Sequence, residues 1–290
     1  MAEVIISTHG ASFADVVAIA RDGAKVVISK ESLAAMQKSR DHVEALAASD
    51  TPVYGISTGF GALANRHVST DLRTQLQRSL IRSHAAGVGA PVEVEVVRAL
   101  MALRLKTLAS GRTGVRPVVA QTMAAILNAG ITPLVREFGS LGCSGDLAPL
   151  AHCALVLMGE GEAVDRDGVA KPVAQLLKEA GIEPVQLAEK EGLALINGTD
   201  GMLGMLILAI HDLRNLVDSA DVVAAMSVEG LLGTDRVFIP ELHAPLRSHP
   251  GQATSAARML ATLAGSGIVA SHLHNDDRVQ DAYSLRCAPQ

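Results

Sequence analysis

The sequence lacks tryptophan and has few other aromatic residues, since only two tyrosines and four phenylalanines occur among 290 residues. Cysteine is also scarce: the three cysteines, at positions 143, 153 and 287, form no CxxC pair. An odd number of cysteines without paired spacing is typical of reduced thiols. We therefore expect a cytoplasmic protein with free thiols.

The sequence contains no run of lysine or arginine, and its formal net charge is -5, which argues against a nucleic-acid partner. The first residues, MAEVIISTHGASF, have neither a basic start nor a sustained apolar run, so we predict no signal peptide. The longest apolar stretch is GMLGMLILAI at 201–210. A bilayer span needs ~20 apolar residues, so we interpret this stretch as a buried helix and expect no membrane partner.

Familiar catalytic and metal-binding motifs are absent as well. We find no GxSxG elbow, no P-loop and no HExxH. His272 and His274 precede a short acidic run, but no further ligand cluster accompanies them. Such a pair is more typical of a solvated loop than of a metal site. We therefore predict neither a metal nor a diffusible cofactor.

The composition, 49% hydrophobic and 19% charged, predicts a chain that buries a sizeable core. Helical periodicity recurs at 32–48, 71–83, 93–108, 115–128 and from 199 to about 232. Short β-branched runs predict strands at 3–7 and 26–30, and Asp167-Gly168 predicts the turn of a hairpin within 161–172. The predicted fold class is mainly α with a minor β portion near the N-terminus.

A weak boundary signal at Gly111 to Gly114 divides the chain into two expected parts. Residues 1–112 would form an α/β-containing N-terminal part, and residues 113–290 would form a helical core.

Two of the polar motifs lie in the first part. YGISTGFG at 54–61 places three glycines beside Tyr54 and Phe60, two of the six aromatic residues, which favours a packed or ligand-facing loop over a plain surface turn. SHAAGVG at 83–89 places His84 at the end of a predicted helix. A histidine there is most often a partner of the helix dipole, so His84 alone predicts little.

Three further motifs lie in the second part. LINGTDGM at 195–202 places Asn197 just before the long helix, which Thr199 or Asp200 would cap. VQDAYSLRCAPQ at 279–290, if helical, places an amide, a phenol and a guanidinium on one face at Gln280, Tyr283 and Arg286. An arginine there is suited to a carboxylate, although an exposed polar face gives the same pattern.

The remaining motif is FGSLGCSGDLAPLAH at 138–152, whose glycine, serine and aspartate residues indicate a bend between two apolar segments. With the four motifs above, it resembles the histidine and aromatic amino-acid ammonia-lyase family, in the same order along nearly the whole chain. The resemblance implies that family's long-helix bundle. It also implies that the tripeptide Cys143-Ser144-Gly145 cyclises and loses water to give 4-methylidene-imidazol-5-one, which supplies an electrophile that no side chain offers. The family most often has alanine where this sequence has Cys143.

The resemblance further implies an activity, the loss of ammonia from L-histidine to give trans-urocanate. Matching the motifs makes Tyr54 the candidate base and His84, paired with Ser83, the sensor of the substrate side chain. Arg286 would bind the substrate carboxylate. Asn197 and Tyr283 would orient the prosthetic ring and the departing amine, and Gln280 would support them. Relatives are homotetramers whose sites draw on three subunits, so a homo-oligomer is implied as well.

Family members continue beyond the last motif into a long C-terminal half, so the resemblance implies a chain that lacks its C-terminal part. Three alternatives stay open. An aminomutase with the same prosthetic group would return a β-amino acid, and another aromatic amino-acid lyase with that group would eliminate ammonia from a different substrate, although the Ser83-His84 pair favours histidine elimination. A catalytically silent helical module would not form the ring at all.

Overall fold

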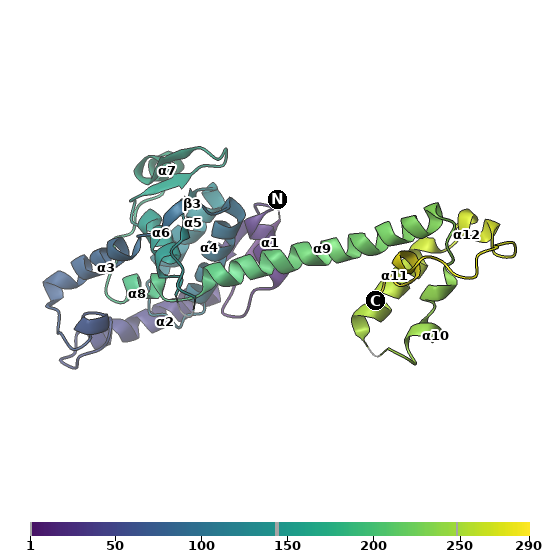
Figure 1. Ribbon diagram of the computed structural model, residues 1–290. Coiled ribbons are helices and arrows are strands. Elements are labelled where there is room, and N and C mark those ends of the chain that lie inside the picture. Colours follow the sequence, from purple (N-terminus) through teal and green to yellow (C-terminus); the bar gives the residue numbers. More distant parts are fainter. Residues whose placement is uncertain (1, 143–144, 248) are drawn as a thin grey trace. The chain divides into compact units, whose positions relative to one another are not determined.

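The computed structural model describes residues 2–142, 145–247 and 249–290, and the chain forms two compact units, Met1–Leu208 and Ala209–Gln290 (Figure 1). The long helix α9, Asp200–Gly230, runs through the boundary between them. The boundary expected near residue 112 falls inside the first unit, because α4 (Val94–Ala109) and α5 (Pro117–Ala129) on either side of it pack into one core. The intervening glycines form a tight connection between packed helices.

The first unit is mainly helical, as predicted. Besides α4, α5 and the start of α9, its elements are β1 (Glu3–Ile6), α1 (Phe13–Ala20), β2 (Lys25–Ile28), α2 (Lys30–Ala47), α3 (Thr70–His84), β3 (Val88–Pro91), β4 (Thr132–Pro133), β5 (Arg136–Phe138), α6 (Leu147–Leu157), β6 (Glu162–Val164), β7 (Ala170–Pro172), α7 (Val173–Ala180) and α8 (Glu191–Ile196), with a short 3-10 turn at Gly61–Leu63.

Helix α4 lies at the centre of this unit. Every residue from Val97 to Leu105 is buried, so the helix has no solvated face, which is typical of a core helix. Helix α5 packs against it, and α6 packs in turn against α5 (Figure 1). Cys153 on α6 belongs to the same core, and burial strongly raises the pKa of its thiol. The core therefore includes α6, the helix that begins directly after Asp146.

The predicted helices are confirmed, with small shifts at their ends. Helix α2 begins after Ser29, whose hydroxyl accepts a hydrogen bond from the Ser32 backbone N–H, so the cap lies three residues before the expected one. Helix α5 starts at Pro117 and ends at Gly130, which has a φ of 74° in the left-handed region.

The strands are short and form three small sheets. β1 and β2 pair in parallel, with Glu3 opposite Lys25, and α1 connects them. The predicted hairpin is confirmed as β6 and β7, with Gly168 at a φ of 77° in its turn. β4 extends that hairpin, and β3 pairs antiparallel with β5. Strands therefore also occur well beyond the N-terminal region where most β structure was expected.

The apolar stretch 201–210 is only partly buried, which corrects the prediction of a buried helix. Ile207 and Leu208 are buried, whereas Met205 and Leu206 are about half exposed. By length and composition, Glu191–Gly230 is apolar enough to cross a membrane, with 39% of its most apolar window buried. A single such helix is weak evidence, because core helices of soluble proteins meet the same criterion.

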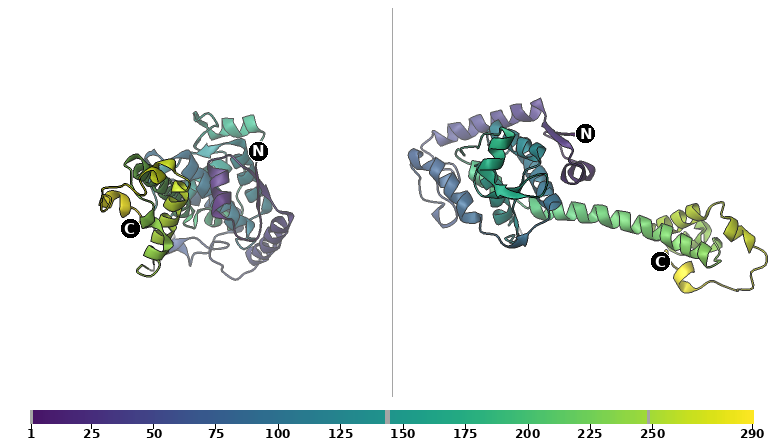
Figure 2. Two further views of the ribbon diagram at one scale, coloured as in Figure 1. Left: turned by 90° about the vertical axis from the view of Figure 1, so that its right-hand side faces the viewer. Right: turned by 90° about the horizontal axis from the view of Figure 1, so that it is seen from above.

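The second unit packs short helices against the C-terminal part of α9 (Figure 2). They are α10 (Pro240–His243), α11 (Pro250–Leu263), α12 (Gly267–Ser271) and α13 (Tyr283–Arg286), with a 3-10 turn at Arg236–Phe238. Phe238 and Met259 are fully buried among them. Gln280 lies before α13 and outside any helix, so the helical face expected to join it to Tyr283 and Arg286 is not formed.

Candidate active site

In the loop between β5 and α6, the described residues on either side of positions 143 and 144 are hydrogen-bonded to each other. Leu141 N–H donates to the Gly145 carbonyl at 2.8 Å, and Gly145 N–H donates to the Gly142 carbonyl at 3.1 Å. Gly145 itself is buried. Two of the predicted site residues, Cys143 and Ser144, lie outside the described residues. The described arms bring the chain on either side of them close together.

The residue after the turn, Asp146, is 1% exposed and connects the loop to the start of α9. Its carboxylate accepts hydrogen bonds from the Ser140 hydroxyl at 2.7 Å and from the backbone N–H groups of Gly201 and Met202 at 2.8 and 3.1 Å. Asp146 N–H donates in turn to the Gly198 carbonyl at 3.1 Å. An aspartate from another element therefore satisfies the first N–H groups of α9.

The capping role expected of Thr199 or Asp200 is thus taken by Asp146. The Asp200 carboxylate instead forms a buried ion pair with Arg104 on α4. Burial raises the pKa of Asp200, and the Arg104 guanidinium opposes that rise. Arg104 also donates to the carbonyls of Ala194 and Asn197 at 3.0 and 3.3 Å, at the C-terminal end of α8. This fixes the backbone of Asn197, whose side chain is exposed.

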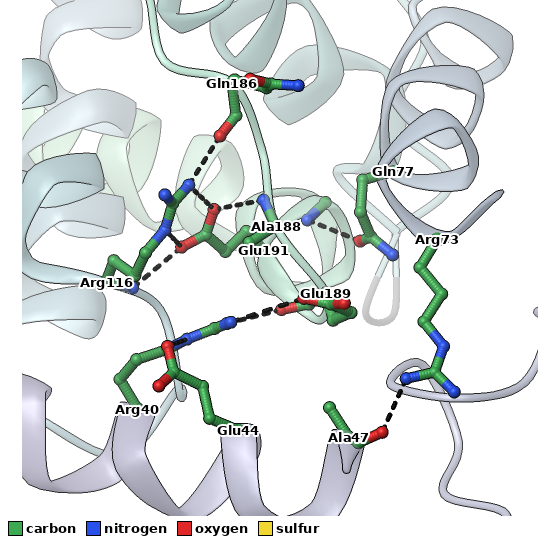
Figure 3. Close-up of polar contacts among 11 residues, drawn as sticks. Arg40, Glu44, Ala47, Arg73, Gln77, Arg116, Gln186, Ala188, Glu189 and Glu191 are labelled. Carbon is green, nitrogen blue, oxygen red and sulfur yellow. Dashed lines mark hydrogen bonds and ion pairs between the residues drawn. The ribbon is translucent and has the colours of Figure 1, made fainter. Parts of the chain in front are cut away.

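A second buried carboxylate fixes the other end of α8 (Figure 3). Glu191 is fully buried and binds the Arg116 guanidinium through both oxygens at 2.8 Å. It also accepts from the backbone N–H groups of Arg116 and Ala188. Next to it, Gly192 N–H donates to the Gln77 side chain on α3 at 2.9 Å. Helix α8 is therefore bound at both ends by buried charged groups and is tied to α3.

His84 is the last residue of α3, and its ring is oriented by its own helix. Its Nδ1 lies 2.8 Å from the Leu80 carbonyl and 3.1 Å from the Ser83 hydroxyl. A carbonyl can only accept, so Nδ1 carries the proton in that contact, and in the neutral ring Nε2 keeps its lone pair. The half-buried imidazole thus offers an acceptor nitrogen at the exit of α3.

The chain leaving His84 lies against the loop between β5 and α6. β3 pairs with β5, with Val88 opposite Phe138, immediately before Gly139. Gly87 N–H donates to Nε2 of His152 on α6 at 3.2 Å. The structure therefore brings the segment after His84 beside the turn that contains Gly145.

Tyr54 lies in a compact loop that packs on α8, as the glycine pattern predicted. A Cβ at Gly55 would lie 2.9 Å from Leu193, so this loop approaches α8 closely. The Tyr54 ring is 49% exposed and makes an edge contact with Phe60, with 6.1 Å between ring centroids. Its hydroxyl accepts from Gly61 N–H at 3.4 Å. The loop backbone is packed while the phenol remains accessible.

The remaining predicted residues belong to the second unit. The Arg286 guanidinium lies 4.2 Å from the centre of the Tyr283 ring, a cation–π contact. Tyr283 is 69% exposed, and Gln280 is exposed as well. Tyr283 and Arg286 are thus brought together, although not by the extended helical face that was expected.

Comparisons with known proteins identify the family. A family model described as aromatic amino acid lyase matches residues 11–290. The chain belongs to the aromatic amino acid lyase family. It is 63% identical over all 290 residues to a histidine ammonia-lyase of Streptomyces coelicolor, of which it covers 56%. The chain therefore spans little more than half the length of this relative.

Solved structures of the aromatic amino acid lyase fold agree. The histidine ammonia-lyase of Trypanosoma cruzi has a TM-score of 0.86 and 36% identity, with 99% of this chain and 53% of that chain covered. A tyrosine aminomutase from Streptomyces globisporus has a TM-score of 0.89 and 39% identity, with 99% of this chain and 57% of that chain covered. The mainly α fold expected from the motifs is confirmed.

The sequence motifs did not reveal the residues that hold the backbone of the motif segments in place. Asp146 and His152 belong to a quoted motif but were given no role, and Arg104 and Glu191 were not considered. Asp146 follows a glycine-rich turn, which is a local signal, whereas Glu191 meets Arg116 across 75 positions and nothing near it in sequence indicates that contact. Among the described residues, no group of three or more His, Cys, Asp or Glu side chains is placed to bind a metal ion.

Proposed function

We propose that this chain is the part of a histidine ammonia-lyase that carries the electrophile and that it eliminates ammonia from L-histidine to give trans-urocanate. The observation that carries the proposal is the hydrogen bonding of Leu141 and Gly142 to Gly145, next to buried Asp146, which is bound to the start of α9. The 63% identity to a protein named histidine ammonia-lyase selects the substrate.

The described residues fit a ring formed from Cys143-Ser144-Gly145. A Cβ at position 145 would lie 3.0 Å from Gly142 N and from two atoms of Leu141, so only glycine fits the turn without displacement. Ring closure needs the residue 145 nitrogen to approach the residue 143 carbonyl, and a tight turn without a side chain permits that approach. When formed, 4-methylidene-imidazol-5-one would supply an electrophile that takes up the substrate.

His84 is proposed to recognise the substrate imidazole. Its Nδ1 donates to Leu80, so its Nε2 lone pair is available to accept from an imidazole N–H. The Ser83 hydroxyl, 3.1 Å from Nδ1 and 2.9 Å from the Leu80 carbonyl, supports this tautomer. An apolar side chain at position 84 would leave the substrate imidazole without this partner.

Further roles are proposed for the other motif residues. Tyr54 is the candidate base that removes the β-proton, and its exposed phenol in a packed loop is compatible with that role. Arg286 would bind the substrate carboxylate, since a guanidinium fork matches two oxygens. Asn197 and Tyr283 would orient the prosthetic ring and the departing amine. Gln280 would support them.

The assembly is proposed to be a homo-oligomer, a tetramer by analogy with the family, in the cytoplasm. Exposed apolar side chains on α9 support subunit contacts: Leu206, Leu216, Val223 and Met226 are each more than half exposed. Such apolar surface is normally covered by another protein surface. A homo-oligomer would also allow Tyr54, Asn197 and Arg286 of one site to come from different subunits.

The test has two independent measurements. Purified protein incubated with L-histidine should accumulate urocanate absorbance, and its intact mass should be lower than the sequence mass by two water molecules. Ser144→Ala should show neither change. Absence of product from wild-type protein at high concentration contradicts lyase activity, and turnover by Ser144→Ala contradicts the proposed electrophile.

An aminomutase is a second candidate, favoured by the similarity to the Streptomyces globisporus tyrosine aminomutase. Chromatography of the products from L-histidine and L-tyrosine distinguishes the two, because an aminomutase returns a β-amino acid and releases no ammonia. A catalytically silent helical module would give neither product and an unchanged mass.

A further inference from the structure

We propose that His152 is a positioning residue that joins the segment after His84 to the helix that follows the ring-forming turn. His152 lies on α6, which begins at Leu147 directly after Asp146. Its Nε2 accepts a hydrogen bond from Gly87 N–H at 3.2 Å, and Gly87 is three residues beyond His84. One helix thus contacts both segments.

The backbone segments at this junction are closely packed. A Cβ at Gly87 would lie 3.2 Å from both His152 Nε2 and Arg136 Cβ. A Cβ at Gly139, at the start of the ring-forming loop, would lie 3.0 Å from Ala148 Cβ and 3.4 Å from Gly87 Cα. The absence of a side chain at these two glycines therefore lets both segments approach each other and α6 closely.

The hydrogen bond requires one particular protonation state of the ring. To accept from Gly87, Nε2 must carry a lone pair, so the proton of the neutral imidazole is on Nδ1. Burial lowers the pKa of His152, and the positive charge of Arg136 on β5 adds to that effect. Both influences favour the neutral ring that the contact needs.

The hydrogen bond between Gly87 and His152 restrains the segment that follows α3. It lies between the end of α3 and Val88, the first residue of β3, which pairs with Phe138. The segment 85–87 is therefore fixed on both sides, which limits how far the C-terminal end of α3 can turn. If His84 recognises the substrate as proposed above, His152 acts on substrate affinity through the direction of His84, without itself touching the substrate.

Two variants of His152 distinguish the effect of losing the hydrogen-bond acceptor from the effect of losing the ring. His152→Phe keeps a ring of similar size but has no acceptor, whereas His152→Gln places an amide oxygen near the position of Nε2. The matched control is His42→Phe on the exposed side of α2. Hydrogen–deuterium exchange of the Gly87 amide should be about two- to ten-fold faster in His152→Phe, the range for one lost hydrogen bond, and close to wild type in His152→Gln.

The exchange measurement needs no enzymatic activity, so it decides the proposal even if the proposed lyase function fails. Unchanged Gly87 exchange in His152→Phe, or equal acceleration in both variants, overturns the proposal. In an active enzyme, His152→Phe should raise the KM for L-histidine about two- to ten-fold with kcat nearly unchanged and the two-water mass loss retained. Loss of the mass change in this variant, or a fall in kcat alone, would contradict a positioning role.

Discussion

The Asp146 carboxylate accepts a hydrogen bond from the backbone N–H of Gly201 at 2.8 Å, although 55 positions separate the two residues. Asp146 directly follows Gly145, and the N–H that it binds belongs to the first turn of α9. A single buried side chain therefore couples the geometry of the turn to the start of the longest helix in the chain.

Replacing Asp146 with alanine would leave the Ser140 hydroxyl and two N–H groups of α9 without this acceptor. We expect a loss of about 2–3 kcal/mol in the free energy of unfolding, measured by urea denaturation. We also expect incomplete loss of the two waters by intact mass. Asp71→Ala, at the exposed start of α3, is the control and should cost less than about 1 kcal/mol. Equal losses in the two variants would contradict the coupling.

Gly145→Ala introduces a Cβ at 3.0 Å from three atoms of the turn. The turn must open by a few tenths of an ångström, so the ring should form more slowly, which a time course of intact mass after synthesis would detect. Gly10→Ala is the control, since no atom lies within 4 Å of its added Cβ. A wild-type rate of mass loss in Gly145→Ala would show that the turn is not constrained in this way.

Glu191→Gln removes the charge of a fully buried carboxylate that binds Arg116. Because a glutamine amide cannot accept all four hydrogen bonds that Glu191 accepts from Arg116 and Ala188, while the guanidinium is 35% exposed and can be solvated, we expect a loss of about 1–3 kcal/mol in the free energy of unfolding. Glu44→Gln breaks the contact between Arg40 and a side chain that is 54% exposed, and it should cost about 0–1 kcal/mol (Figure 3). Urea unfolding of both variants checks the difference, and similar midpoints would refute it.

His152 predicts a pH dependence of stability. Its folded-state pKa lies below the ordinary value of about 6.5. The unfolded chain therefore binds a proton at this position at higher pH than the folded chain does. The contribution of His152 to the free energy of unfolding is fully present above pH ~6.5 and is lost as the pH falls from there toward the folded-state pKa. His152→Gln should flatten this part of the curve of unfolding free energy against pH. Parallel curves for wild type and variant would contradict the prediction.

Tyr54→Phe removes the candidate base and retains the ring that contacts Phe60. We expect kcat to fall by about 10²-fold or more, with little change in the KM for L-histidine and none in the intact mass. Phe60→Leu disturbs the same loop without removing the phenol and should change kcat less. Retained turnover in Tyr54→Phe would assign the base to another group.

Local sequence patterns predicted the helices and the hairpin, whose formation depends mainly on residues close together in the chain. The α2, α3, α4 and α5 helices follow from apolar spacing and from caps such as Pro117 and Gly130. The β6–β7 hairpin follows from its Asp-Gly turn. The strands β3, β4 and β5 were missed, because they have at most four residues each and owe their pairing to segments distant in sequence.

The residues of the candidate site likewise fall into those that local patterns predicted and those that depend on contacts distant in sequence. The positions of His84, Asn197 and Tyr54 on a helix end or a loop were predicted from glycines and helix periodicity. Their supports were not, because Arg104, Glu191 and His152 act across long sequence separations on backbone groups. The last motif was treated as a helix through Gln280 only conditionally, because the helical spacing of three side chains does not ensure that the backbone before Tyr283 is helical, and α13 begins at Tyr283.

The buried thiol of Cys153 can serve as a chemical probe of how often the core of the first unit opens. Only a thiolate reacts readily with alkylating agents, and burial in the core suppresses the thiolate at this position. With Cys143 and Cys287 replaced by alanine, the rate at which an alkylating reagent modifies the protein therefore reports how often the core around α6 becomes accessible to solvent.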